Sequence, residues 1–548
     1  MKKILTYLVP VIITLLYAGI AFYVFIPAIN IHNIGAWMFL ISIAAVYAIC
    51  SFAASLSAPA RRRTFPKTSA AALIVIAAAV VICAVGMLVS MQIFRAKSYV
   101  NRITIEEGDF NSDVPTLSDI KKIPLMDTDS ATILGDRVVG SLTDLVSQYD
   151  VSDTYTTIYY NGKVVKVAPL EYAGFFKYYN NKKDGIPGYV LVDTETNEAE
   201  FVRMEDGINY SPSGYFSKDL MRTFRMKYPT LTFGDYSFQI DEDGVPYWVI
   251  SCMSYHTFFG CTAPDQAVIM NAVTGETELY SMEEIPEWVD YVYSGDEICD
   301  LYNSYGSLQN GFINSIIGQK GCTMTTDDFG YVAMNDDIYV YTGITSIVSD
   351  KSNLGFLLVN SRTGEFKYYE QEGAEEHSAM DAAEGVVQNY GYKASFPALI
   401  NINSEPTYAM ALKDSKGLVK QYAMVNVKNY TIVAVGDTMS ETLKNYKSAM
   451  NSAGQGLDIK LAVDYHEEDI VVTGIQFVNT ENGTVVYIKS EQKVYKQYFD
   501  DNESLILLNE GDRITVQYDA SEEEKDIIEI SGYEASGSAA EMTGTDAE

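Results

Sequence analysis

The sequence predicts three N-terminal transmembrane helices, then an α+β region of repeated helix-on-antiparallel-sheet units, and finally a small C-terminal β-barrel. Three observations predict this class. Residues 1–104 contain nine Lys and Arg and no Asp or Glu, whereas the remaining 444 residues carry all 72 acidic side chains. Two long N-terminal windows contain no charged residue, and a hairpin-like segment recurs further along the chain. The charge asymmetry predicts a membrane part and an acidic, water-exposed part.

The membrane part is predicted for residues 1–98. No charged residue occurs between Ile4 and Ala60 or between Thr68 and Phe94, and each window exceeds the roughly 20 apolar residues that cross a bilayer. We place the spans at Ile4–Ile26, Ala36–Leu56 and Ala70–Phe94. The first is too long for a cleaved signal peptide and is followed by two more, so it is predicted to be an uncleaved anchor. No acid, Lys or Arg lies at mid-depth, which favours an anchor over a transport pathway.

The basic residues around these spans predict the orientation, because basic flanks stay on the cytoplasmic side. Six of them favour a cytoplasmic N-terminus and second loop: Lys2, Lys3, Arg61, Arg62, Arg63 and Lys67. Arg95, Lys97 and Arg102 oppose this assignment. The sequence therefore predicts a multi-pass protein of the cell membrane, in contact with the lipid bilayer, with a large extracytoplasmic C-terminal region.

A linker is predicted at residues 99–124, and an internal repeat at residues 125–452. The segments GYVLVDTETNEAEF (188–201), QAVIMNAVTGETELY (266–280) and GFLLVNSRTGEFKYY (355–369) share an apolar run followed by one polar pattern. A degenerate copy is QYAMVNVKNYTIVAV (421–435), with Asn429 near its turn. The shared positions are Asp193, Thr196 and Glu198; Asn271, Thr274, Gly275 and Glu276; and Asn360, Thr363, Gly364 and Glu365.

This pattern predicts a strand, a tight turn and a returning strand, because Asn or Asp caps a turn and Gly or Asn tolerates positive φ. Helices are expected at Ala131–Gln148, Ser217–Lys227 and Ala374–Asn389, where apolar residues recur at spacings of three and four. Strand pairs are expected at 156–160 with 164–167 and at 237–240 with 247–251. Insertions at Ala173–Gly185 and Met253–Asp265 are expected to interrupt the sheets. The units span approximately 125–210, 211–285, 286–372 and 373–452.

The order of helix, strands and final hairpin resembles the PepSY and PepSY-like domain, a small module in which a helix packs on an antiparallel sheet. The closest matches to its D-x-x-T-G-E/K turn are the copies that begin at Asn271 and Asn360. The resemblance implies a non-catalytic extracytoplasmic role, often the regulation of a peptidase or a cell-wall lytic enzyme. It supplies no active-site residues.

After a helix predicted at Thr438–Ala453, residues 453–533 contain short alternating segments separated by Asn, Gly and Asp. Such segments are typical of small OB or SH3-like barrels. This part is acidic, which argues against nucleic acid as a partner. Residues 534–548 lack apolar periodicity and are predicted to be disordered.

No catalytic, cofactor-binding or metal-binding constellation is predicted. The histidines at 32, 256, 377 and 466 have no metal-ligand spacing. Asp241, Glu242, Asp243 and Gly244 suit a hairpin turn better than a calcium loop, because Cys252 stands where an EF-hand needs a bidentate Glu. Ser118 and Lys121 match S-x-x-K, a spacing that arises often by chance.

Four cysteines lie in the predicted outer region: Cys252, Cys261, Cys299 and Cys322. They allow two disulfides, and the local choice pairs 252 with 261 and 299 with 322. Free buried thiols are the alternative, and the spacing does not match a zinc site.

Together these observations predict a membrane-anchored scaffold or regulator, without enzymatic activity or a cofactor, that binds another envelope protein such as a peptidase or cell-wall hydrolase. Two alternatives remain open at this point. The chain could be a sensory subunit in which an extracellular ligand shifts the three helices, or an envelope enzyme with an unrecognised site.

Overall fold

A computed structural model describes residues 2–56, 65–117, 123–326, 328–347, 353–454, 465–480, 483–491, 493–499, 502–519 and 525–534. The chain divides into two compact units. The first comprises Met1–Leu117 and Lys121–Asp458, and the second comprises Ser118–Ile120 and Ile459–Glu548. The predicted cytoplasmic cluster Arg61, Arg62 and Arg63, the Ser118/Lys121 pair and the tail beyond residue 534 lie outside the described residues.

Three N-terminal helices are long and apolar enough to cross a membrane: α1 (Lys2–Phe25), α2 (Ile34–Leu56) and α3 (Lys67–Ser90). Large apolar side chains point outward along them, and small residues such as Ala72 and Ala79 are buried between them. The Ser69 hydroxyl donates to the carbonyl of Ala48 at 3.1 Å. Small residues at the contact allow the backbones to approach closely, as is typical of helix packing in membranes.

The third helix ends earlier than the predicted Phe94. It stops at Ser90, Met91 is extended (φ −60°, ψ 145°), and α4 (Gln92–Val100) begins in a new direction. The cause is tertiary, because the Ser90 hydroxyl accepts a hydrogen bond from the backbone N–H of Phe259 at 2.8 Å. Residues 101–454, which follow the helices, are called the sheet domain below.

Four sheets make up the described part of the sheet domain. The first has the order β2-β4-β5-β6, with β3 also paired to β4, and the second has the order β10-β9-β8-β7. Their strands are β2 (Tyr149–Val151), β3 (Thr156–Tyr160), β4 (Lys163–Tyr172), β5 (Ile186–Asp193), β6 (Glu198–Ile208), β7 (Thr232–Ile240), β8 (Pro246–Tyr255), β9 (Thr262–Asn271) and β10 (Thr277–Ser281). The helices of this part are α6 (Thr128–Gly140), α7 (Phe175–Asn181) and α8 (Leu220–Lys227).

The third sheet has the order β1-β15-β14-β13-β11 with β12 paired to β13, and the fourth has the order β16-β18-β19-β20 with β17 paired to β18. Their strands are β1 (Ile105–Glu107), β11 (Thr323–Thr325), β12 (Gly330–Met334), β13 (Asp337–Ser346), β14 (Asn353–Asn360), β15 (Phe366–Gly373), β16 (Lys393–Ala394), β17 (Ala398–Ile402), β18 (Glu405–Lys413), β19 (Val419–Asn426) and β20 (Val433–Gly436). The helices are α5 (Phe110–Asp113), α9 (Gly295–Leu308), α10 (Glu376–Val386) and α11 (Met439–Ser452). Both β1 and α5 lie in the segment predicted as a linker.

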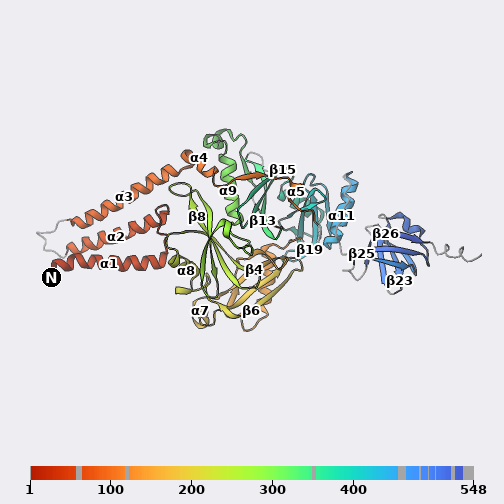
Figure 1. The fold of residues 1–548 in the computed structure, drawn as a ribbon, viewed down its shortest axis with the longest axis horizontal. Coiled ribbons are helices and arrows are strands. Elements are labelled where there is room, and N and C mark those ends of the chain that lie inside the picture. Colours follow the sequence, from red (N-terminus) through yellow and green to blue (C-terminus); the bar gives the residue numbers. More distant parts are fainter. Residues whose placement is uncertain are drawn as a thin grey trace, which may run out of the picture. The chain divides into compact units, whose positions relative to one another are not determined.

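Consecutive sheets share their hydrophobic cores. One core contains Val190 of the first sheet and Trp248 of the second, and another joins Val249 of the second sheet to Leu357 of the third through α9. A further core joins the third sheet to the fourth through α10. Figure 1 shows α9 beside β8 and β13. Because a shared core cannot be divided without exposing apolar surface, the four sheets behave as one folded body.

Several elements differ in extent from the predictions. The helix predicted at 131–148 ends at Gly140, and the following residues form turns. The insertion expected at 173–185 contains α7, and the one expected at 253–265 is instead the extended end of the β8–β9 hairpin. No prediction was made for α9, whose N-terminal Ser294 hydroxyl accepts from the N–H of Glu297 at 3.1 Å.

The second unit contains one six-stranded sheet with the order β21-β25-β26-β24-β23-β22. Its strands are β21 (Tyr465–Val471), β22 (Gly474–Thr480), β23 (Gly483–Ser490), β24 (Lys493–Tyr498), β25 (Arg513–Asp519) and β26 (Lys525–Glu534). Val486, Tyr495, Leu505 and Ile514 are among the residues of its core. Among the described residues β21 and β22 are the two edges and do not pair, so closure into a barrel stays a prediction.

Candidate functional site

The turn residues singled out from the sequence cap the last hairpin of the first three sheets. The side-chain oxygen of Asp193 accepts from the N–H of Thr196 at 3.0 Å, that of Asn271 from Thr274 at 2.8 Å, and that of Asn360 from Thr363 at 2.9 Å. Asn426 does the same in the fourth sheet by accepting from Asn429 at 2.9 Å. These groups are occupied with their own turns.

The remaining motif residues also serve the hairpins. Asn197, Gly275 and Gly364 have positive φ of 58°, 76° and 70°, the conformation that glycine and asparagine tolerate best. The Thr274 hydroxyl accepts from the N–H of Glu276 at 3.2 Å, and Glu365 forms an ion pair with Lys367 at 3.1 Å. No reactive geometry results, so the motif is structural.

All six cysteines are free thiols, so neither of the two disulfides appears; Cys252, Cys261 and Cys322 are buried, and Cys299 is half-buried. Cys252 faces the core that the first two sheets share, and Cys261 occupies the turn beyond β8 with a φ of 51°. Burial raises the pKa of the Cys252 and Cys299 thiols to about 12. Such thiols are unreactive at neutral pH.

The other sequence candidates have local roles. Asp241 accepts from the N–H of Val245 at 2.8 Å and so closes the β7–β8 turn at Gly244. His32 lies between α1 and α2, and its Nδ1 is 3.0 Å from the carbonyl oxygen of Phe258. Within the described residues no three His, Cys, Asp or Glu side chains group as metal ligands.

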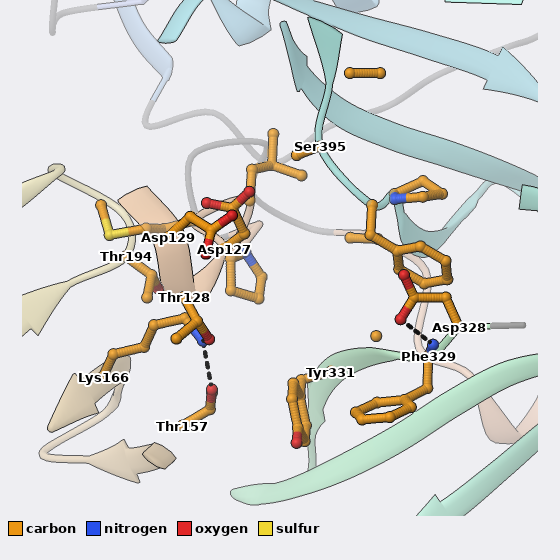
Figure 2. Close-up of a pocket in the computed structure, with 18 of the residues that line it drawn as sticks. Asp127, Thr128, Asp129, Thr157, Lys166, Thr194, Asp328, Phe329, Tyr331 and Ser395 are labelled. Carbon is orange, nitrogen blue, oxygen red and sulfur yellow. Dashed lines mark hydrogen bonds between the residues drawn. The ribbon is translucent and has the colours of Figure 1, made fainter. Parts of the chain in front are cut away.

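A pocket of about 510 Å³ lies where the first, third and fourth sheets meet. We call it the three-sheet pocket. Figure 2 shows Lys166 on one side of it and Phe329 and Tyr331 on the other. Its lining residues are Pro124, Leu125, Met126, Asp127, Thr128, Asp129, Thr157, Lys166, Thr194, Asp328, Phe329, Gly330, Tyr331, Ala394, Ser395, Phe396, Pro397, Ala398 and Lys413.

Lys166 is the unusual residue of this pocket, because it is a lysine with an exposed fraction of only 4%. Its ammonium donates to the hydroxyl of Thr157 at 2.9 Å and to that of Thr128 at 3.4 Å. It also lies 5.8 Å from the centre of the Tyr331 ring. In the part of the chain that the structure describes, no carboxylate lies within ion-pair distance of it. A buried cation with only hydroxyl partners is energetically costly.

Burial lowers the pKa of Lys166 to about 8, although the negative charge of Asp127 opposes the shift. The amine is therefore mostly protonated at neutral pH and loses its proton just above it. A protonated amine in a half-open cavity attracts an anionic group, since the field of a charge is weakly screened away from water.

Asp127 is not the missing counter-ion of Lys166, because it forms an ion pair with Lys413 instead. The Lys413 ammonium forms an ion pair with Asp127 across the pocket, and the Asp127 carboxylate also caps α6 by accepting from the N–H of Ser130 at 2.9 Å. Burial alone would raise the pKa of Asp127, but the bonds from Lys413 and Ser130 hold it below its ordinary value. This ion pair joins the first sheet to the fourth.

The rest of the pocket combines acidic and aromatic surfaces. Asp129 and Asp328 are exposed carboxylates in its lining, and the rings of Phe329, Tyr331 and Phe396 supply an apolar wall. Sequence reasoning missed this site. The one signal was Lys166 itself, a lone cation in the apolar run VVKVA of β4.

Comparisons with known proteins identify no family for this chain. No family model matches it, and no curated protein matches it. Among solved structures, it has a similarity to an apocarotenoid oxygenase variant of Synechocystis with 8% identity and a TM-score of 0.13, covering 68% of this chain and 60% of that one. A TM-score this low defines no shared fold.

Proposed function

We propose that the protein is a membrane-anchored sensory subunit whose sheet domain binds a small ligand with an anionic group in the three-sheet pocket. The observation that carries this proposal is the buried ammonium of Lys166, which has two hydroxyl partners and no carboxylate within 4 Å among the described residues. An anionic group of the ligand would supply the missing counter-charge.

The pocket's other charges define the ligand class further. Asp129 and Asp328 oppose a multiply charged anion and favour a ligand that also carries a cationic group. The aromatic wall suits an apolar portion between the two charges. A zwitterion of the size of an amino acid or dipeptide meets these three requirements.

A sensor also needs a connection from its ligand to its helices, and the end of the β8–β9 hairpin supports one. We call residues 256–261 the hairpin tip. The N–H of Phe259 donates to Ser90 at the end of α3, and the carbonyl of Phe258 contacts His32 between α1 and α2. A Cβ atom on Gly86 of α3 would lie 2.5 Å from the Phe259 ring, so the contact is close. The β8–β9 hairpin thus connects the sheet cores to α3 and to the loop between α1 and α2.

The finer architecture forms part of the same proposal. We place the N-terminus in the cytoplasm and the sheet domain outside, by the distribution of basic residues. We retain PepSY-like repeats as the description of the four sheets and a small barrel as that of the second unit. The recurring turn geometry of the four sheets supports the repeat.

The second candidate is the scaffold or regulator of another envelope protein. It is favoured by β6, an 11-residue strand at the edge of the first sheet whose outer side pairs with no strand in the described part of the chain. A partner segment could add to this edge as a further strand.

The proposal is tested by ligand binding to the full-length chain in lipid nanodiscs. Amino acids and dipeptides form the panel, with acetate and phosphate as simple anion probes, and thermal unfolding is the readout. A ligand at 100 times its dissociation constant should stabilise the protein by about 2.7 kcal/mol. Lys166→Met should abolish this effect. Lys163→Met is the matched control, because Lys163 begins the same strand with its side chain half exposed and paired to Asp193 at 2.9 Å.

The pH dependence provides a second criterion. Since the pKa of Lys166 is about 8, affinity for the anionic group should fall about tenfold per pH unit above that value. Equal binding by wild type and Lys166→Met, or no stabilisation by any member of the panel, would contradict the sensory proposal and leave the protein-partner candidate.

A further inference from the structure

An aromatic surface stands exposed on the sheet domain at α7 and at the short helix η3 (Phe216–Lys218). Phe176 is 79% exposed, Tyr179 57% and Phe216 54%. Phe175 links them, with its ring centre 5.1 Å from that of Tyr215 and 5.7 Å from that of Phe176. We call these five residues the aromatic patch. Contiguous exposed aromatic surface in a stable protein marks an interaction site.

One of these rings, that of Phe216, is exposed by a backbone conformation that is unfavourable for phenylalanine. Phe216 has a φ of 58°, a conformation that bulky residues rarely adopt. Its carbonyl accepts a hydrogen bond from the guanidinium of Arg222 at 3.0 Å, which fixes the corner. A strained position that exposes an apolar ring suggests a function for that ring.

The charge around the patch is opposite to that of the domain. Beyond residue 104 the chain has a net charge of about −42, yet four lysines lie within or beside the patch. They are Lys177, Lys182, Lys183 and Lys218. The Lys182 ammonium stands 4.0 Å from the centre of the Tyr179 ring. Aromatic rings with interspersed lysines are typical of the membrane interface, where rings reach the acyl boundary and ammonium groups contact phosphates.

The patch adjoins the end of the first membrane helix. Arg222 of α8, which reaches Phe216, also donates to the carbonyl of Tyr23 at 3.2 Å, and its guanidinium lies 4.6 Å from the Tyr23 ring. Arg225, one turn later, donates to the carbonyl of Ile26 at 2.9 Å. Tyr23 lies in the last turn of α1, which ends at Phe25, and Ile26 follows directly. The patch is therefore continuous with the level at which this helix leaves the bilayer.

A second exposed apolar segment follows α9, which packs against α4, the continuation of the third helix. Ile313, Ile316 and Ile317 are 72%, 62% and 81% exposed. Figure 1 shows α9 near α4 and shows α7 at the end of the sheet domain that faces the helices. Apolar surface thus occurs beside the end of the first helix and near α4, which continues the chain from the third helix.

We propose that the aromatic patch and the isoleucine segment Ile313–Ile317 rest in the headgroup region of the leaflet from which α1 and α3 emerge. The lipid bilayer is the occupant that fits, because both surfaces adjoin helix ends and the patch carries lysines. The five aromatic rings and the three isoleucines, inserted beside the three helices, fix the orientation of the sheet domain on the membrane.

The test uses the full-length chain at one copy per nanodisc, with Phe176→Trp and Ile317→Trp as separate probes. Discs contain either ordinary phosphatidylcholine or phosphatidylcholine brominated on its acyl chains, since bromine quenches tryptophan on contact. Each variant is compared with the parent chain, which supplies the emission of the native tryptophans. Tyr390→Trp is the control, because Tyr390 is 68% exposed and follows α10, which packs on the fourth sheet. Among the four sheets of the sheet domain, this one, marked by β19 in Figure 1, lies farthest from the helices.

In brominated discs the emission of the introduced tryptophan should fall by about half for both probes, and that of the control should not change. Emission that stays unquenched and water-like at Phe176→Trp would overturn the proposal by showing a solvated patch. Emission that is shifted to the blue yet unquenched would also overturn it, because protein would then cover the patch.

Discussion

Glu376 is an acid in an apolar setting. It is fully buried at the first turn of α10, beside Gly343 of β13. Burial raises its pKa to about 7, and both carboxylate oxygens are buried without a hydrogen-bond partner in the described part of the chain. Together with Lys166 and with Asp290, whose pKa burial raises to about 8, it gives the sheet domain three buried groups that change charge close to neutral pH. Such groups are costly in a core and mark positions where stability responds to pH.

Glu376→Gln should therefore flatten the pH dependence of stability. A carboxyl whose pKa is raised on folding contributes stability below its unfolded value of 4.5, and this contribution is lost as the pH rises through about 7. The wild type should lose up to about 1.4 kcal/mol per pH unit in that window. Thermal midpoints of both chains between pH 4 and 8 measure this, with Glu372→Gln, an exposed position, as control. Parallel curves for wild type and Glu376→Gln would show that the carboxyl does not titrate there.

At the scale of the elements, one backbone hydrogen bond recurs where consecutive sheets join. In the second, third and fourth sheets, the carbonyl of the residue that follows the capping Asn accepts this bond from the segment that leaves the preceding sheet. Tyr210 donates to Ala272 at 3.1 Å, Tyr293 to Ser361 at 2.9 Å, and Ala374 to Val427 at 2.9 Å. The rings of Tyr210 and Tyr293 also lie against Gly275 and Gly364, where a Cβ atom would approach within 2.3 and 2.5 Å. The turn motif thus connects sheets as well as strands.

Asn271→Ala should cost about 1–2 kcal/mol, because the N–H groups of Val273 and Thr274 lose their acceptor. Gly275→Ala should cost more, since a φ of 76° and contact with Tyr210 both oppose a methyl group. Asn271→Asp should retain stability, as Asp193 holds the equivalent turn in the first sheet. Thermal unfolding of the three variants measures this order, and a neutral Gly275→Ala would disprove the role assigned to the turn.

On the scale of the whole first unit, the shared cores turn four sheets into one body, and the hairpin tip joins that body to the helices. The three-sheet pocket and the hairpin tip lie on different sheets, which are linked through the cores of the first, second and third sheets. A change at one end can reach the other only if these packed layers move together.

Gly86→Val should loosen this connection. The added side chain would meet Phe259 and displace the hairpin tip, so amide hydrogen exchange at residues 256–261 should accelerate about tenfold, equal to 1.4 kcal/mol. Gly19→Val is the matched control, because a Cβ atom there meets nothing within 4 Å. Unchanged exchange in Gly86→Val, measured by mass spectrometry on the nanodisc protein, would refute the close contact.

Much of the secondary structure was predictable because its signals are local. The uncharged windows indicate the three apolar helices, and Asp193, Asn271 and Asn360 indicate the hairpins. The helix at 131–148 was predicted too long, because Leu142, Leu145 and Val146 continue the apolar spacing beyond Gly140 although they lie in turns. The helix α9 was missed, since Gly295 and Gly306 weaken its pattern and its stability comes from the core between two sheets.

The sequence by itself determined the division into an apolar, basic N-terminal part and an acidic, sheet-rich remainder, since charge and periodicity are properties of neighbouring residues. Which residues form the candidate site is determined only by the tertiary structure. The three-sheet pocket brings together Asp127, Lys166, Tyr331 and Lys413, which are separated by up to 286 positions. Their approach depends on how four sheets pack, and packing is set by shape and burial across the whole domain rather than by any local pattern.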